Sequence, residues 1–249
     1  MCQTKHSLFF VTAALLLLSS TLLAEENRMT YRIAKLPSSA DVTLDWSAPP
    51  WQDVVPLRVA NFMGRKPIHF PTVAAKVGYN DDAIFVIFRV DDQYVRAVAD
   101  AHQGAICNDS CVEFFFTPNA DTTLGYFNLE MNCGGTMLFH FQRKPRQAPS
   151  VLTPDDIDQV TVAHSQPRQV DPEIVEPTEW FVAYRVPFDL IRKRFPDDFS
   201  EPASGVRWRG NFYKCADRTS HPHWLTWAPV SRPQPDFHRP ESFGILEFE

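Results

Sequence analysis

Hydrophobic and polar residues alternate along most of this chain in short runs that are typical of β-strands. In residues 181–186 (FVAYRV) successive side chains would point to opposite faces, and Pro187 then ends the run. Turn-forming pairs such as Gly134-Gly135 separate such runs. Similar runs, rich in Val, Ile, Phe, Tyr and Trp, predict strands at 74–79, 83–90, 110–116, 126–132, 136–142, 159–165, 179–186, 205–214 and 244–248.

The order of these segments predicts the fold class. Strands follow one another without long helices between them, which favours antiparallel pairing over a doubly wound parallel sheet. We therefore predict an all-β fold, a two-sheet antiparallel β-sandwich with one or two short helices. The apolar spacing at 188–195 predicts one short helix, and a second is expected at 95–101.

Residues 1–24 have the pattern of a secretion signal. Lys5 and His6 precede an apolar run at 8–18, and Ala24 stands before an acidic pair. The run is short for a membrane span, and no other long apolar run follows. We predict a signal peptide over 1–24, a single domain over 25–249, and a chain that is secreted or periplasmic and has no membrane span.

Composition excludes several classes of function. The chain has 24 Lys and Arg against 30 Asp and Glu, a formal net charge of −6, and no basic stripe, which argues against nucleic acid as a partner. The sequence has no G-x-S-x-G elbow for a catalytic serine and no Gly-rich phosphate loop. Four cysteines follow residue 24, and they could form two disulfides in any of three pairings or stay as buried thiols: Cys107, Cys111, Cys133 and Cys215.

Several motifs, taken in order, make the chain similar to the family 9 carbohydrate-binding modules. They run from Trp46 and Pro50-Trp51 through 79–82 (YNDD), 109–115 (DSCVEFF) and 126–132 (YFNLEMN) to Trp227 and Phe243-Gly244. The resemblance covers roughly 41–249. It implies a DOMON-type, immunoglobulin-like sandwich that binds sugars without chemistry and accompanies glycoside hydrolases.

The resemblance also carries site residues onto this chain. In members attached to xylanases, two tryptophans clamp a terminal sugar. One of these positions falls on Phe237, and the other falls near Cys107, where no ring exists. The family's carboxylate falls on Glu113, and its sugar-binding arginine falls on Glu130. Half of the clamp is therefore missing.

The strands themselves predict a polar face. Glu113 and Glu130 lie on strands expected to be neighbours, and Asn128 and Asn132 share the face of Glu130 by the period of two. Carboxylates and amides would bind sugar hydroxyls. Three other interpretations of the two acids remain open: a structural Ca²⁺ site, the acid and base of a glycoside hydrolase, or solvated or Arg-paired residues on an ordinary sheet face.

A Pro-rich loop near the C-terminus supplies the candidate rings. Phe237, His238 and Arg239 lie among prolines and polar residues, and Trp224 is a second candidate ring. Sugars stack on aromatic faces while polar neighbours fix their orientation. The remaining tryptophans are expected in the core: Trp46, Trp51, Trp180, Trp208 and Trp227.

These observations predict a non-catalytic protein that binds a mono- or oligosaccharide through a site formed by Glu113, Asn128, Glu130, Asn132, Trp224, Phe237, His238 and Arg239. No cofactor is predicted beyond the open question of Ca²⁺. A rival hypothesis is a haem-binding electron-transfer domain on the same sandwich, with Met63 or Met131 and a histidine as ligands. His221 and His223 have a spacing that could bind a metal, but a surface turn is the preferred interpretation.

Overall fold

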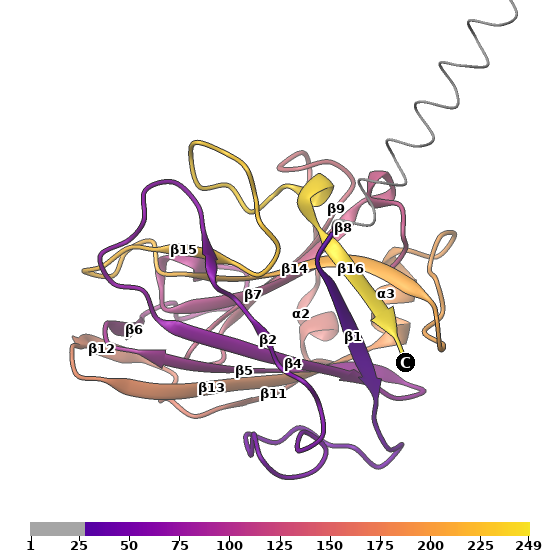
Figure 1. The fold of residues 1–249 in the computed structure, drawn as a ribbon, viewed down its shortest axis with the longest axis horizontal. Coiled ribbons are helices and arrows are strands. Elements are labelled where there is room, and N and C mark those ends of the chain that lie inside the picture. The colour runs from indigo at the N-terminus through magenta and orange to yellow at the C-terminus, as the bar shows by residue number, and fades with distance from the viewer. Residues whose placement is uncertain (1–27) are drawn as a thin grey trace, which may run out of the picture.

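The computed structural model describes residues 28–249, so the predicted signal peptide lies outside the described residues. Figure 1 shows two layers of strands with helical turns at one side. The upper layer has the strand order β10, β9, β8, β7, β14 and β16. Their bounds are β10 Ser150–Val151, β9 Met137–Gln142, β8 Tyr126–Asn132, β7 Cys111–Thr117, β14 Arg207–Cys215 and β16 Gly244–Phe248.

The lower layer has the order β4, β5, β13 and β11, and β2 pairs with the outer side of β4. The bounds are β4 Thr72–Tyr79, β5 Ala83–Asp92, β13 Thr178–Pro187, β11 Thr161–His164 and β2 Leu57–Arg58. Short strands complete the structure: β15 Trp224–Thr226 beside β14, β3 Asn61–Phe62 beside β15, and a separate pair of β6 Val95–Ala97 with β12 Val170–Ile174. The helices are α2 Pro154–Ile157 and α3 Phe188–Arg194, with 3₁₀ turns η1 Ile106–Asn108, η2 Thr122–Leu124 and η3 Pro240–Ser242.

Strand β1, Thr30–Lys35, joins the two layers. Its first residues pair in parallel with β16, and its last two residues pair in parallel with β4. Figure 1 shows β1 and β16 side by side where the upper layer passes into the lower one. The predicted antiparallel pairing therefore holds for most neighbours, and β1 is the exception that makes the strands one continuous path.

Alternation along the strands builds the core between the layers. Phe88 of β5 and Phe212 of β14 face each other with ring centroids 6.1 Å apart, and Phe212 stacks on Phe114 of β7 at 4.6 Å. Burying each such ring contributes about 1.5–3 kcal/mol relative to leaving it exposed. The tryptophans expected in the core are buried at 51, 180, 208 and 227, whereas Trp46 is half-buried under the Lys76 ammonium.

Most predicted strands are confirmed with ends shifted by a few residues. The helix expected at 95–101 is wrong, because Val95 and Ala97 pair with β12 as strand β6. The helix after Pro187 is confirmed as α3. The predicted strand list also omitted β1, although its residues alternate between exposed and buried, and it omitted the short strands, which have few residues.

The structure contradicts the prediction of disulfides. Among residues 28–249, Cys107, Cys111, Cys133 and Cys215 are free thiols, three of them buried. The alternative of buried thiols is the one that the structure supports.

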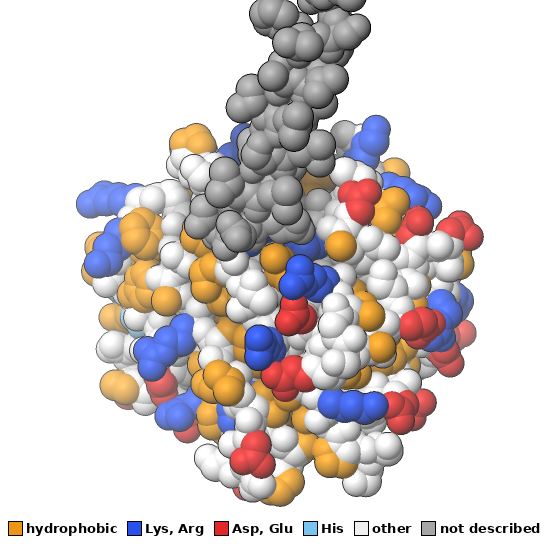
Figure 2. All heavy atoms as spheres, turned by 45° about the vertical axis from the view of Figure 1, so that its right-hand side comes forward, with side chains coloured by type: hydrophobic (Ala, Val, Ile, Leu, Met, Phe, Trp, Pro, Cys, Tyr) orange, Lys and Arg blue, Asp and Glu red, His pale blue; other side chains and the backbone are white. Residues whose placement is uncertain are grey.

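Surface charge and helix length are the features that concern possible partners. Figure 2 shows acidic and basic side chains interspersed on the face in view, with no gathered positive patch there. Among the described residues, no helix has the length and apolar character needed to cross a membrane.

Candidate ligand-binding pocket

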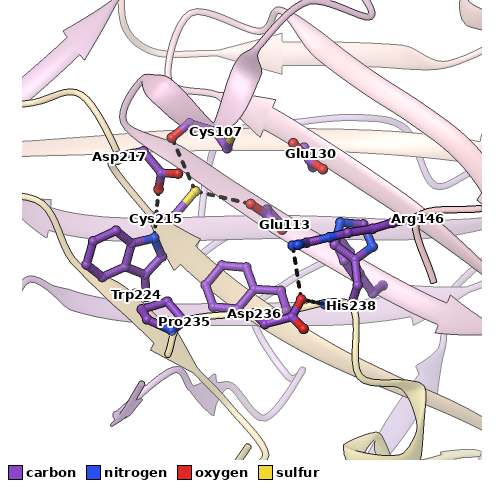
Figure 3. Close-up of a pocket in the computed structure, with 12 residues that line it drawn as sticks. Cys107, Glu113, Glu130, Arg146, Cys215, Asp217, Trp224, Pro235, Asp236 and His238 are labelled. Carbon is purple, nitrogen blue, oxygen red and sulfur yellow. Dashed lines mark hydrogen bonds and ion pairs between the residues drawn. The ribbon is translucent and has the colours of Figure 1, made fainter. Parts of the chain in front are cut away.

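A pocket opens on the outer face of β7, β8 and β14, on the side away from the main core. The pocket volume is about 120 Å³, below the range of about 300–1,000 Å³ typical of sites that enclose a whole small molecule, so part of a ligand would stay outside it. Figure 3 shows carboxylates, a thiol, a guanidinium and aromatic rings converging on it. A wider hollow of about 760 Å³ lies along β1, but the charged residues that line it are all exposed. We therefore take the first pocket as the candidate site.

The pleat of β7 and β8 places two glutamates on the pocket floor. Val112 and Phe114 point into the main core, so Glu113 between them points outward, and on β8 the outward position is Glu130. The two glutamates are directly opposite each other in the antiparallel register. The predicted common face of Glu113 and Glu130 is thus observed, and both side chains are buried.

Burial and mutual repulsion govern the charge of this pair. Burial raises the pKa of Glu113 well above its usual value, and the neighbouring Glu130 carboxylate raises it further. Burial also raises the pKa of Glu130 to about 7, although the hydrogen bond from Asn128 opposes that shift. Two carboxylates this close share protons near neutral pH because both cannot ionise without strong repulsion.

One wall of the pocket is formed by Trp224 and Asp217. The Trp224 ring is half-buried, and its Nε1 donates a hydrogen bond of 2.8 Å to Asp217 Oδ1. Burial raises the pKa of Asp217, and the Trp224 hydrogen bond opposes this. The loop that carries Asp217 is tied down by its backbone N–H, which donates to the carbonyl of Cys107 at 3.0 Å. Trp224 is therefore a ring held in a defined orientation at the pocket.

The opposite wall is polar and carries a cation. Arg146, in the loop after β9, makes an ion pair of 3.0 Å with Asp236. His238 Nδ1 lies 2.7 Å from the Tyr126 hydroxyl, which can donate to it when the ring is neutral. Burial lowers the pKa of His238 to about 4, and nearby Arg146 lowers it further. The imidazole is thus neutral at neutral pH and can act as an acceptor.

The structure divides the predicted site residues into two groups. Five of them line the pocket: Glu113, Glu130, Trp224, Phe237 and His238. Asn128 lies beside it, donating to Glu130 Oε1 at 3.2 Å and accepting from Gln142 at 2.8 Å, so it orients the floor carboxylate. Arg239 does not line the pocket but pairs with Asp236 at 2.6 Å.

Asn132 also lies outside the pocket, and its side chain holds the turn between β8 and β9. Its Oδ1 accepts from the backbone N–H groups of Gly134 and Thr136, and its Nδ2 donates to Asp109 at 2.8 Å. Its polar atoms are used within the protein, and it does not line the pocket, so the structure gives Asn132 no direct contact with the candidate site.

Phe237 lies on the pocket wall but is not the open ring that the sequence suggested. Its side chain packs into a buried cluster, stacks on Tyr213 at 4.2 Å, and leaves the residue only 7% exposed. The Tyr213 hydroxyl donates to the Phe237 carbonyl and fixes the loop. Trp224, which is more exposed, is the better candidate for stacking on a ligand.

Several pocket residues were not predicted: Arg146, Cys215, Asp217, Pro235 and Asp236. Most of them come from loops, where no periodic pattern marks a side chain as facing a site. Cys107, near the position where the resemblance places one clamp tryptophan, also lines the pocket. Two strand positions were within reach of sequence reasoning. Period two along β14 places Cys215 on the same face as Tyr213, and period two along β7 places Phe115, which also lines the pocket, on the same face as Glu113.

Two alternatives from the sequence can be compared with the geometry. Met63 and Met131, either of which was considered as a haem ligand together with a histidine, are buried in two different hydrophobic clusters. His223 uses both ring nitrogens, one with Lys214 Nζ at 2.7 Å and one with the His221 carbonyl, so the two histidines do not form a metal pair. A different set, Cys111, Glu113 and Cys215, brings potential metal-ligating atoms within 4.8 Å of one another.

The fold and the pocket together define a class of protein. It is a β-rich domain with one sheet face covered by loops, and at that face it has a small polar pocket with an aromatic wall.

The chain belongs to carbohydrate-binding family 9, whose family model matches residues 40–248. A solved structure of a candidate carbohydrate-binding protein from Bacteroides uniformis ATCC 8492 is similar, with a TM-score of 0.76 and 25% identity over 90% of this chain and 100% of that chain. No match was found among curated proteins.

Two further similar structures are of a family 9 carbohydrate-binding module from Caldicellulosiruptor kristjanssonii. The complex with glucose has a TM-score of 0.60 and 11% identity, over 89% of this chain and 96% of that chain. The complex with cellotriose has a TM-score of 0.59 and 11% identity, over 89% and 94%. At this identity the likeness concerns the fold alone.

Proposed function

We propose that this protein binds a mono- or oligosaccharide in the pocket described above and does no chemistry on it. The observation that carries the proposal is the convergence of two buried carboxylates and one half-exposed tryptophan ring on a single pocket. Membership of carbohydrate-binding family 9, and the glucose and cellotriose bound by structurally similar modules, support a sugar as the ligand.

Each part of the pocket has a role in such binding. The Trp224 ring offers a flat surface for the C–H face of a sugar, a contact comparable to other ring contacts worth about 0.5–1.5 kcal/mol. Glu130 accepts hydrogen bonds from hydroxyls, and hydrogen bonds to charged groups are about twice as strong as neutral ones. Arg146 lies on the opposite wall, where its guanidinium can donate to further hydroxyl oxygens.

Binding rather than hydrolysis fits the placement of the acids. Glu113 and Glu130 project side by side from neighbouring strands and approach a ligand from the same direction. The two acids of a glycoside hydrolase flank the scissile bond, with one on each side for leaving-group protonation and for attack. We therefore assign the pair to hydroxyl recognition.

The proposal extends to the setting of the protein. We propose that residues 1–24 direct export, that the chain acts outside the cytoplasm, and that it holds glycans in support of their breakdown by glycoside hydrolases carried on other chains. We also propose that the two layers form a DOMON-type sandwich. No cofactor is needed for binding of this kind.

Isothermal calorimetry against glucose, cellotriose and a panel of other mono- and oligosaccharides tests the function. At least one sugar should bind, and Trp224→Ala should weaken that binding about two- to tenfold, because a stacking contact of about 0.5–1.5 kcal/mol is lost. Trp224→Phe retains a ring and should restore most of the affinity.

A matched control is Trp46→Ala, which removes a half-buried tryptophan outside the pocket. It should leave the affinity unchanged. The proposal fails if no sugar in the panel binds, or if Trp46→Ala and Trp224→Ala weaken binding equally. A colorimetric assay for sugar release should stay at background, and turnover that is lost in Glu113→Gln would instead identify a hydrolase.

A further inference from the structure

Beneath the pocket floor lie two thiols and a carboxylate in close contact. Cys111 begins β7, Cys215 ends β14, and the two are direct partners in the antiparallel register. Glu113 is two residues along β7 and so projects on the same side. The two sulfurs and a Glu113 oxygen all lie within 4.8 Å of one another, and all three residues are buried.

Hydrogen bonds within the protein do not satisfy this group. Cys215 Sγ lies 3.1 Å from Glu113 Oε1, but Glu113 Oε2 is buried without a hydrogen-bond partner. A buried oxygen without a partner is costly, because its desolvation is not repaid. Figure 3 shows the Cys215 sulfur lying between the Cys107 carbonyl and the Glu113 carboxylate, with Glu130 and Asp217 nearby. The surroundings are rich in acidic groups, which a bound cation would balance.

We propose that Cys111, Glu113 and Cys215 bind a Zn²⁺ ion at the pocket floor. Two thiolates and one carboxylate suit zinc, which binds sulfur and oxygen in tetrahedral geometry. Ca²⁺ prefers six to eight oxygens and is a poor match for a set in which two of three donors are sulfur. Glu113 and Cys215 line the pocket, so water or a ligand hydroxyl in the pocket would supply the fourth ligand.

The separation of the Cys215 sulfur and the Glu113 oxygen is close to that of two ligand atoms on one zinc ion. Zinc bonds of about 2.3 Å to sulfur and 2.0–2.2 Å to oxygen in a tetrahedron separate neighbouring ligand atoms by about 3.6–3.8 Å. The Cys215 to Glu113 distance of 3.1 Å would lengthen by about half an ångström. The site is also incompatible with a Cys111–Cys215 disulfide, because both thiolates are needed for the metal.

The test is a metal titration of the full chain in the absence of sugar, so its result does not depend on the proposed function. Protein is reduced, stripped with a chelator, freed of both reagents under nitrogen, and titrated with Co²⁺ and then Zn²⁺. We expect one ion per chain by elemental analysis, a thiolate-to-cobalt charge-transfer band, and loss of that band as Zn²⁺ displaces Co²⁺.

Variants identify the ligands. Cys215→Ser and Cys111→Ser should each weaken Zn²⁺ binding by more than about 100-fold, because loss of even an outer-shell partner costs about 10–100-fold. Glu113→Gln should weaken it and leave the charge-transfer band in place at high Co²⁺. Cys133→Ser is the matched control, since Cys133 is an equally buried thiol that lies in the main core. It should bind Zn²⁺ like the unmodified chain.

Circular dichroism and thermal unfolding of each metal-free variant establish that it is folded. The proposal is overturned if the reduced, folded chain binds no Zn²⁺ at micromolar concentration, or if folded Cys111→Ser and Cys215→Ser variants bind it as tightly as the control. Mass spectrometry of the purified, unreduced chain gives a second check. Zinc-bound protein should keep both thiols free, whereas a Cys111–Cys215 disulfide in protein isolated with zinc present would contradict the site.

Discussion

Glu113 and Glu130 occupy positions where acidic residues lower the stability of the fold. Both are buried, and they face each other across two strands, where like charges destabilise a sheet. Acidic side chains are almost never fully buried unless they are paired, and strongly perturbed pKa values cluster at functional sites. By contrast Asn132, two residues further along β8, is satisfied by the protein itself. The role of a polar residue on this sheet face therefore depends on its partners rather than on its type.

At the residue scale we predict that Asn132→Ala separates folding from binding. The change leaves the buried N–H groups of Gly134 and Thr136 without their acceptor, so the free energy of unfolding should fall by about 1–3 kcal/mol. Sugar affinity should stay the same, because the side chain does not line the pocket. Urea denaturation and calorimetry measure the two effects. Unchanged stability with weakened binding would return Asn132 to the site.

At the scale of elements, one buried carboxylate connects the two short α-helices. Asp156 of α2 lies 2.8 Å from Lys193 Nζ of α3 and also pairs with Arg194. It completes a capping box with Thr153 at the start of α2. α2 spans one turn only, and such a short helix is not stable by itself. The ion pairs to α3 therefore hold α2 in place against the edge of the fold.

This arrangement predicts a specific response to acid. Burial alone would raise the pKa of Asp156, but hydrogen bonds from Lys193 and Arg194 outweigh it and hold the pKa well below its usual value. The stabilisation is present above the unfolded-state pKa and is lost as the pH falls from about 5 toward the lower folded-state pKa.

Asp156→Asn should lower the free energy of unfolding at neutral pH by about 1–3 kcal/mol and flatten its decline in acid. Urea denaturation at a series of pH values measures this. Asp155→Asn is the control, because Asp155 is the exposed neighbour in the same turn, and its effect should stay within about 0.5 kcal/mol. Equal acid sensitivity in Asp156→Asn and the unmodified chain would contradict the assignment.

At the scale of the whole molecule, a buried ion pair links the two layers. Lys214 of β14 lies 3.4 Å from Asp92 of β5, and neither side chain is exposed. His69 contacts the other Asp92 oxygen at 2.6 Å, and His223 lies 2.7 Å from the Lys214 ammonium. Burial raises the pKa of Asp92, but Lys214 and His69 outweigh it and keep the carboxylate charged. A polar network thus crosses between the layers at the end of β14 that carries the pocket.

Removing one partner of this ion pair should lower the free energy of unfolding substantially. Lys214→Met leaves the Asp92 carboxylate buried without its main counter-charge, so we expect a loss of about 3–5 kcal/mol in the free energy of unfolding. Lys35→Met is the control, because it breaks an exposed pair with Asp81 and should cost less than about 1 kcal/mol. Guanidinium denaturation compares the two. Similar small losses would mean that the buried pair does not hold the layers together.

The sequence by itself determined most of the longer strands and the direction of their side chains. Period-two alternation is local, so it correctly placed Glu113 and Glu130 on one face of β7 and β8 and sent Phe114 and Leu129 into the core. The motifs of the carbohydrate-binding family follow one another in the expected order along the chain, and the match to the family over residues 40–248 confirms them.

Only the tertiary structure decided which polar residues form a site. Phe237 is buried because Tyr213, from a distant strand, offers it a ring to stack on. Arg146 and Asp217 reach the pocket because their loops fold back over the sheet, and the pairing of Cys111 with Cys215 follows from the register of β7 with β14. These features depend on contacts between residues far apart in the chain, and no local pattern of hydrophobic and polar positions encodes them.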